Sequence, residues 1–195
     1  MKYISLGSNC SVAFQLKKRE LKNECYPFDW CKISILQLVK VLNNNFDDYS
    51  ESLIIKKISQ KHLSLFNDYS LVLKNKYNIE FAHEVVNESD FNNFKDKINI
   101  RINNFKEICN SVSIDKIIFI RIELKPIKLI YKEYIIKLVE LLNRLSTNYI
   151  LRLIINTNIE FSDLPTNVQI YKFNEFVNDW QMNNINWDAI ILYDS

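Results

Sequence analysis

The single glycine of this chain, Gly7, is the strongest constraint on how its first residues fold. It follows a short apolar run, Tyr3–Leu6, that is typical of a β-strand. Glycine reaches backbone angles that are closed to other residues, so Gly7 permits a sharp change of direction after this strand. In a sequence of 195 residues that is otherwise devoid of glycine, the one that is kept stands where only glycine fits. We therefore predict a tight turn at Gly7.

A helix is predicted directly after this turn. Ser8 and Asn9 are both favoured at helix N-caps, and the apolar residues of 12–16 form a buried stripe. Cys10 then falls in the first helical turn, where free backbone N–H groups and the helix macrodipole favour an anion. Such a place lowers the pKa of a thiol, which makes Cys10 a candidate nucleophile. The alternative is a small buried hydrophobe, the commonest role of a free cysteine.

The composition is that of a soluble globular protein. Hydrophobic residues make up 48% of the chain and charged residues 25%, a balance that supports a packed core. The net charge is +2, and the densest basic cluster, Lys17–Arg19, stands where the first helix is expected to end and where cations complement its dipole. We therefore expect no nucleic-acid partner. No apolar run approaches the length of a membrane span, and the chain enters a strand at once instead of a signal peptide, so we expect no membrane association.

The four cysteines, Cys10, Cys25, Cys31 and Cys109, are not spaced as a disulfide framework. A reducing, cytoplasmic location follows as the natural interpretation. No pair has the C-x2-C spacing of a structural zinc site, and the chain has only two histidines. The turn Gly7-Ser-Asn-Cys10 lacks the further glycines of a dinucleotide-binding loop. We therefore predict no metal and no cofactor.

A loop follows the first helix at Tyr26-Pro-Phe-Asp-Trp30. Its proline forces the preceding residue towards an extended conformation, which excludes a helix here. Three aromatic residues surround one acid, Asp29. Either the aromatics pin the loop to the core while Asp29 makes a turn, or Asp29 is a carboxylate in a partly desolvated wall, able to orient a histidine or a substrate.

The other periodic segments indicate alternating strands and helices. A helix with a capping box is expected from Ser34 to its end within Asn43–Asn45, and further helices over Phe91–Cys109 and across about 129–145. Strands are expected as a hairpin of Tyr69–Lys74 and Tyr77–His83, and at Lys116–Ile122, Tyr149–Ile155 and Val168–Phe173. The strand–helix–strand order within 116–155 is a βαβ signature, and handedness rules make its two strands parallel. Residues 51–68 and 176–195 favour neither helix nor strand.

We therefore predict a single α/β domain over residues 1–195, with a mixed sheet whose parallel βαβ core is flanked by helices and lies in the second half of the chain. Asparagine is expected to replace glycine in left-handed helix caps, within Asn43–Asn45 and after Asn110. Two arginines, Arg121 and Arg152, interrupt apolar strands. Each either snorkels out of a strand end or pairs with a carboxylate, and binding of an anionic substrate is the third interpretation.

Three stretches together resemble an uncharacterised family named as papain-like cysteine peptidases, with bacterial and large-DNA-virus members. They are Ile4-Ser-Leu-Gly-Ser-Asn-Cys10, Tyr26-Pro-Phe-Asp-Trp30 and Tyr77…Phe81-Ala-His83, and the similarity continues through Arg101–Phe105 to the strand Ile117–Arg121. The resemblance implies a cysteine-dependent hydrolase of the peptidase type. It also implies a papain-like α+β fold as the alternative to the α/β fold.

In that family the early cysteine and the later histidine are the proposed catalytic pair, which the resemblance carries onto Cys10 and His83 in the first half of the chain. His83 would accept the thiol proton, and the Cys10 thiolate would attack a carbonyl carbon. Asp29 is the candidate that orients His83, with Glu84 as the second choice.

Backbone N–H groups around Ser8, Asn9 and Ser11 are the candidates for oxyanion and substrate binding, with Trp30 as the floor of the cleft. The substrate would be a protein, a peptide or an acyl carrier. Two other functions stay open. One is an acyltransferase that uses the same pair, and the other is a non-catalytic interaction module in which His83 is a structural residue.

Overall fold

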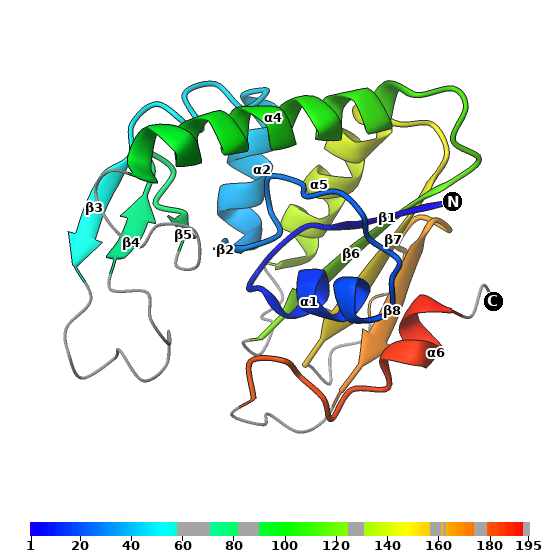
Figure 1. Ribbon diagram of the computed structural model, residues 1–195. Helices are drawn as coiled ribbons and strands as arrows, with labels where there is room; N and C mark the ends of the chain where they lie inside the picture. Colours follow the sequence, from blue (N-terminus) through cyan, green and yellow to red (C-terminus); the bar gives the residue numbers. More distant parts are fainter. Residues whose placement is uncertain are drawn as a thin grey trace.

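The computed structural model describes residues 1–57, 71–81, 90–124, 131–156, 161, 163–173 and 179–192. Figure 1 shows how the strands and helices of these ranges are arranged. The helices are α1 (Ser11–Lys18), α2 (Ile35–Asn43), α4 (Phe91–Asn110), α5 (Tyr131–Leu145) and α6 (Trp187–Ile191). The strands are β1 (Lys2–Ser5), β2 (Cys31–Lys32), β3 (Ile54–Lys57), β4 (Leu71–Lys74), β5 (Glu80–Phe81), β6 (Ile117–Glu123), β7 (Tyr149–Ile155) and β8 (Val168–Lys172).

Four strands form a parallel sheet in the order β1-β6-β7-β8. The register places Ile4 beside Phe119, and Phe119 beside Leu151. All seven residues of β6 are buried, as expected of a parallel strand that is covered on both faces. The unit β6–α5–β7 is the predicted βαβ core, so the α/β fold is confirmed. A papain-like α+β arrangement, which is built on an antiparallel sheet, does not describe this core.

Helices cover the two faces of the parallel sheet in separate groups (Figure 1). On what we call the α1/α6 face, Ile118, Ile120 and Ile122 of β6 pack in one cluster with residues of α1 and α6. On the α2/α4/α5 face, Ile117 and Phe119 pack in a larger cluster with residues of α2, α4 and α5. The alternation along β6 follows from the two-residue period of a strand.

The remaining strands form a second sheet in the order β2-β5-β4-β3, with antiparallel pairing throughout. The parallel and antiparallel strands thus belong to two sheets and not to one mixed sheet. The predicted hairpin is present as β4 and β5, with Leu73 opposite Phe81. These two residues lie in the same hydrophobic cluster as Phe119 and Leu151, so the two sheets share one core.

Local signals in the sequence explain most of the element ends. Ser34 and Gln37 form the predicted capping box at the start of α2. Asn45 adopts a φ of +49° after α2, as predicted for an asparagine in a left-handed cap. The same prediction is wrong at Asn110, because α4 ends on this residue and the next one, Ser111, is extended with a φ of −75°.

The two stretches that the sequence left open are resolved in part. Residues 51–68 contain β3, and the tail contains α6. None of the helices within the described ranges has both the length and the apolar character needed to cross a membrane.

Candidate active site

The connection between β1 and α1 turns sharply at the carboxyl end of the parallel sheet. Gly7 has a φ of +75°, in the left-handed region that favours glycine. A Cβ atom at this position would overlap the side chain of Ile33 and lie 3.1 Å from the carbonyl oxygen of Phe28. The backbone angle and the close approach both exclude other residues, which confirms the prediction that only glycine fits here.

Ser8, the next residue, also has a positive φ, of +87°. This conformation costs an ordinary residue about 1–2 kcal/mol, so it persists only where the surroundings hold it. The Ser8 carbonyl oxygen accepts a hydrogen bond from the backbone N–H of Ile33 at 3.3 Å. Backbone strain of this kind is often found at functional sites.

Cys10 stands at the N-cap of α1, one residue before the first helical turn in which it was predicted. Its carbonyl oxygen accepts the first helical hydrogen bond, from the N–H of Phe14 at 2.9 Å. The side-chain capping comes from Asn9, whose Oδ1 accepts from the Ser11 N–H at 3.1 Å and from the Ser11 hydroxyl at 2.6 Å. The thiol of Cys10 is half-buried at the amino end of this helix. Since Asn9 occupies the Ser11 N–H, that group is committed to the cap, which counts against its predicted role in oxyanion binding.

Asp29 lies wholly inside the protein. Its Oδ2 forms an ion pair with the Lys22 ammonium and accepts a hydrogen bond from the backbone N–H of Tyr26. Its Oδ1 is buried and has no hydrogen-bond partner among the described residues. Burial raises the pKa of Asp29 above its usual range, although Lys22, the Tyr26 N–H and Arg101 act in the opposite direction. Burying a carboxylate oxygen without a hydrogen-bond donor costs free energy, so Asp29 Oδ1 is the unsatisfied acceptor of this cluster.

Cys31 connects the Cys10 turn with the Asp29 loop. Burial raises the pKa of the Cys31 thiol well above its usual range, and negative charge on Cys10 and on Asp29 raises it further. The thiol therefore lies within electrostatic reach of both groups. Its Sγ donates to the carbonyl oxygen of Phe28 at 3.6 Å, so Cys31 is held inside the loop as a protonated thiol.

Aromatic packing fixes the loop from beneath. Phe28 is fully buried and stacks on Phe46 with ring centroids 5.6 Å apart, and it meets Phe105 edge-on at 5.8 Å. The two interpretations of this loop therefore combine: its aromatics pin it to the core, and its acid is desolvated there. Trp30 is half-buried, and its role as the floor of a cleft stays a prediction.

His83 and Glu84 lie outside the described residues, as does His62. The structure thus brings together the Gly7–Cys10 turn and the Asp29 loop, while the pairing of Cys10 with His83 stays a prediction.

Sequence reasoning missed one residue of this site, Lys22. Lys22, whose side chain is only 4% exposed, pairs with Asp29, and nothing in its local sequence distinguishes it from a surface lysine. Arg121 and Arg152 are both fully buried, so the interpretation that they snorkel is wrong. Arg121 pairs with a carboxylate, that of Glu123, at 2.5 Å. Its presence in an apolar strand was the available signal.

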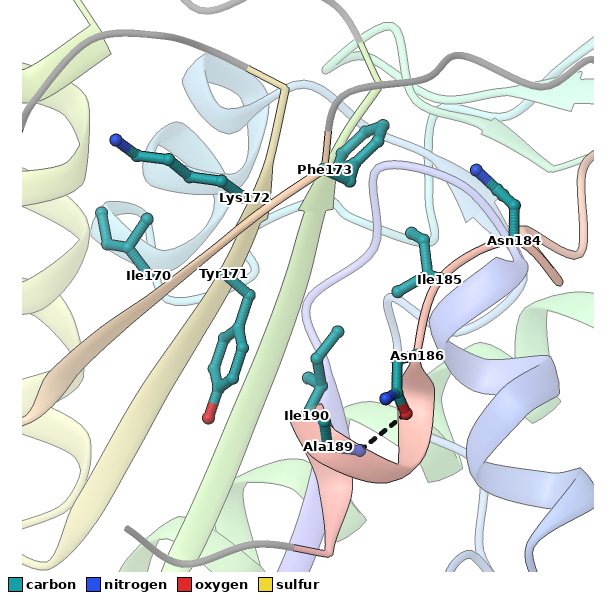
Figure 2. A pocket seen from close by; sticks show the side chains of 9 residues that line it. All are labelled: Ile170, Tyr171, Lys172, Phe173, Asn184, Ile185, Asn186, Ala189 and Ile190. Atoms are coloured by element: carbon teal, nitrogen blue, oxygen red, sulfur yellow. Dashed lines mark hydrogen bonds between the residues drawn. The ribbon is translucent and has the colours of Figure 1, made fainter.

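A cavity of about 610 Å³ opens at the end of β8, beside α6 (Figure 2). Figure 2 shows Tyr171 and Phe173 on one side and Ile185, Asn186 and Ile190 on the other. Its lining carries one lysine and one tyrosine among apolar and amide side chains, so it offers a binding surface.

Comparison with known proteins identifies relatives of the chain. Residues 1–161 match the model of a family described as "Putative papain-like cysteine peptidase". An uncharacterized protein of Acanthamoeba polyphaga mimivirus is 34% identical over 218 aligned positions, which cover 97% of this chain and 96% of the viral protein. No solved structure matches the chain.

Proposed function

The chain belongs to the family described as "Putative papain-like cysteine peptidase", and on that premise we propose that it is a cysteine-dependent hydrolase with Cys10 as its nucleophile. The observation that carries the proposal is the placement of Cys10. A half-buried thiol stands at the amino end of a helix, behind a turn that only glycine can make and at the carboxyl end of a parallel sheet. Ligands of open α/β sheets bind at this end, where loops connect strands to helices.

The other buried thiols are poor candidates. Burial raises the pKa of Cys109 to about 12 and that of Cys31 well above its usual range, so both stay protonated at neutral pH. A protonated, buried thiol is a weak nucleophile. At Cys10, the amino end of the α1 dipole favours an anion, which supports a thiolate as the nucleophile.

The reaction we propose is acyl transfer to water. His83 takes the proton of the Cys10 thiol, and the thiolate sulfur adds to the carbonyl carbon of a peptide or protein substrate. The tetrahedral intermediate collapses to a thioester on Cys10, and His83 returns its proton to the leaving amine. Water, deprotonated by His83, then attacks the thioester, and the acid product leaves as the thiol is restored.

Asp29 has the role of orienting the imidazole in this mechanism. Its Oδ2 is already held by Lys22 and Tyr26, which fixes the plane of the carboxylate. Its buried Oδ1, which has no donor among the described residues, would accept the ring N–H of His83. That hydrogen bond would select the His83 tautomer whose other ring nitrogen faces the Cys10 thiol. It would also give Asp29 Oδ1 a hydrogen-bond donor.

The pH dependence of iodoacetamide alkylation tests the nucleophile directly. We expect Cys10 in the intact protein to alkylate at pH 6 at least tenfold faster than Cys25, which is also half-buried, with the modified residue located by mass spectrometry. His83→Ala should move the half-maximal rate of Cys10 alkylation upward by one or more pH units, since the thiolate loses its proton acceptor.

The chain supplies matched controls for this experiment. His62→Ala replaces the other histidine and should leave the profile of Cys10 unchanged. A panel of peptide and thioester substrates then assigns the acyl group, and Cys10→Ala should abolish turnover. Equal alkylation rates at Cys10 and Cys25, with no effect of His83→Ala, would reject the hydrolase and leave an interaction module.

A further inference from the structure

Arg121 is a buried cation directly beneath the Gly7–Cys10 turn. It is 0% exposed and lies in β6, next to β1, in the register where Ser5 stands beside Ile120. Burying a guanidinium group is costly unless each of its donors finds an acceptor. The partners of Arg121 therefore indicate what the residue is for.

The guanidinium group of Arg121 joins three separate segments. Its Nη1 donates to the carbonyl oxygen of Leu6 at 2.8 Å, and its Nη2 donates to the carbonyl oxygen of Ile33 at 3.1 Å. Its Nε donates to Glu123 Oε1 at 2.5 Å. Glu123 is held in turn by the Tyr131 hydroxyl at 3.3 Å. Burial and the nearby Glu123 carboxylate raise the pKa of Tyr131 to about 12, so this hydroxyl remains a donor.

Both residues whose carbonyl groups bind Arg121 also help to form the Gly7–Cys10 turn. Leu6 is the residue before Gly7, at the point where the chain leaves β1. Ile33 donates its N–H to the strained Ser8 and closes off the space beside Gly7. Ile33 lies four residues after Asp29. Arg121 thus connects the end of β1, which leads to Cys10, with the segment that follows Asp29.

We infer that Arg121 is the positioning residue of the nucleophile turn, which it acts on through the carbonyl groups of Leu6 and Ile33. This inference rests on the proposed function, because it assigns Cys10 as the group that is positioned. Arg121 holds the left-handed Gly7–Ser8 pair against Ile33, so the Cys10 thiol keeps a fixed place at the amino end of α1. The planar fork of arginine is needed, since a lysine ammonium cannot span two carbonyl groups and a carboxylate in the same geometry.

Arg152 provides a matched control on the next strand. It is also 0% exposed, and it also donates to two backbone carbonyl groups, those of Ile190 at 2.7 Å and Ile191 at 3.0 Å, and to Gln169 Oε1 at 2.9 Å. Its partners lie in β8 and α6, on the α1/α6 face, and none of these three residues belongs to the Gly7–Cys10 turn. An effect that arises from any buried arginine will appear in both variants, and an effect on the turn will appear only at Arg121.

The experiment compares Arg121→Lys with Arg152→Lys in the full chain. We expect similar falls of the urea midpoint in both, and a loss of about tenfold or more in the Cys10 alkylation rate at pH 7 in Arg121→Lys alone. The pH profile of Cys10 alkylation should shift in Arg121→Lys and stay fixed in Arg152→Lys, with Cys25 as the internal reference. Amide hydrogen exchange of residues 7–11 should accelerate only in Arg121→Lys.

Two outcomes separate this inference from the proposed function. If Cys10 of the wild-type protein reacts no faster than Cys25, the hydrolase is rejected, and hydrogen exchange alone then decides whether Arg121 anchors the turn. If wild-type Cys10 is selectively reactive and both lysine variants change its rate and exchange alike, the inference on Arg121 is overturned. Should Arg121→Lys fail to fold, Tyr131→Phe loosens Glu123 more mildly, and it must change the Cys10 profile for the inference to stand.

Discussion

On the α1/α6 face of the parallel sheet, Arg152 donates hydrogen bonds to the carbonyl groups of the last helix. On the α2/α4/α5 face, Arg121 donates to the carbonyl groups of Leu6 and Ile33, on either side of the turn that carries Cys10. The register pairs Arg121 with Leu153 and Ile120 with Arg152, so the two arginines are offset by one residue and point to opposite faces.

A buried arginine that donates to backbone carbonyl groups thus serves two purposes in this fold. Arg152 fastens the α6 segment, whose Trp187 donates its indole N–H to the carbonyl oxygen of Met182 at 2.8 Å. Arg121 holds two consecutive residues with positive φ, beside a buried ion pair and a half-buried thiol. Arg152 therefore fastens a helix end, and Arg121 stands beside the strained turn of the candidate site.

Gly7→Ala should produce the largest loss of stability, because it disrupts the strained turn after β1. The new methyl group would be forced into a positive φ and into the Ile33 side chain, at a cost of about 3–5 kcal/mol in the free energy of unfolding. Urea unfolding measures this loss. Asn45→Ala is the control, because Asn45 also has a positive φ but is exposed, and it should cost only about 1 kcal/mol. Equal losses in the two variants would show that the contact with Ile33 carries no weight.

Trp187→Phe should weaken the cluster that α6 shares with α1, while the Gly7–Cys10 turn keeps its own contacts. It removes the indole donor from the Met182 carbonyl group and leaves space in a fully packed cluster, at a cost of about 2 kcal/mol. The Cys10 alkylation rate, relative to that of Cys25, should be unchanged. A fall in that ratio would mean that the packing of α6 against α1 also positions the Cys10 thiol.

The parallel core could be predicted from the sequence because its signals are local and repeated. The apolar run of β6 and the periodic helix of α5 each identify an element, and chain order with handedness then fixes how β6 and β7 pair. The second sheet could not be separated from the first, since β2 and β5 have only two residues each and a two-residue strand has no readable period.

The candidate site shows the same limit. Gly7 predicted the turn because the chain has no other glycine, and the three aromatic residues around Asp29 indicated that this acid is desolvated. The partner of Asp29 is Lys22, and those of Arg121 are Leu6 and Ile33. These contacts form only when the chain folds, and no pattern in the sequence indicates which residues will meet. The strain at Ser8 was equally invisible, since serine gives no sign of a positive φ.

Alkaline pH should loosen the α2/α4/α5 face first, because Cys31 and Cys109 lie in its cluster and the cluster on the other face includes no cysteine among the described residues. Burial raises the pKa of Cys109 to about 12. In the unfolded chain this thiol ionises from about pH 9, so the unfolded state then binds fewer protons than the folded state. The stability that Cys109 contributes is therefore complete below pH 9 and is lost as the pH rises towards 12.

The expected loss from Cys109 is about 1 kcal/mol between pH 8 and pH 10. It is measured as the difference in pH slope between the wild-type protein and Cys109→Ala in urea unfolding. Ile98→Val, a change on the same buried stripe of α4, should lower stability by a similar amount at every pH. Identical slopes for wild type and Cys109→Ala would contradict the prediction.

Ser8→Gly should have the smallest effect on stability. Its effect on the Cys10 alkylation rate tests whether the strain at this turn serves the thiol. Glycine relieves the positive φ of +87° but adds freedom to the unfolded chain, so the two changes nearly cancel and leave a gain of about 0.5 kcal/mol. If the strain at this turn serves the thiol, the extra freedom should slow Cys10 alkylation several-fold while the urea midpoint rises or stays level. A gain in stability with no change in Cys10 reactivity would mean that the left-handed pair is only the way this fold leaves β1. In that case Arg121 and Arg152 would differ in location alone.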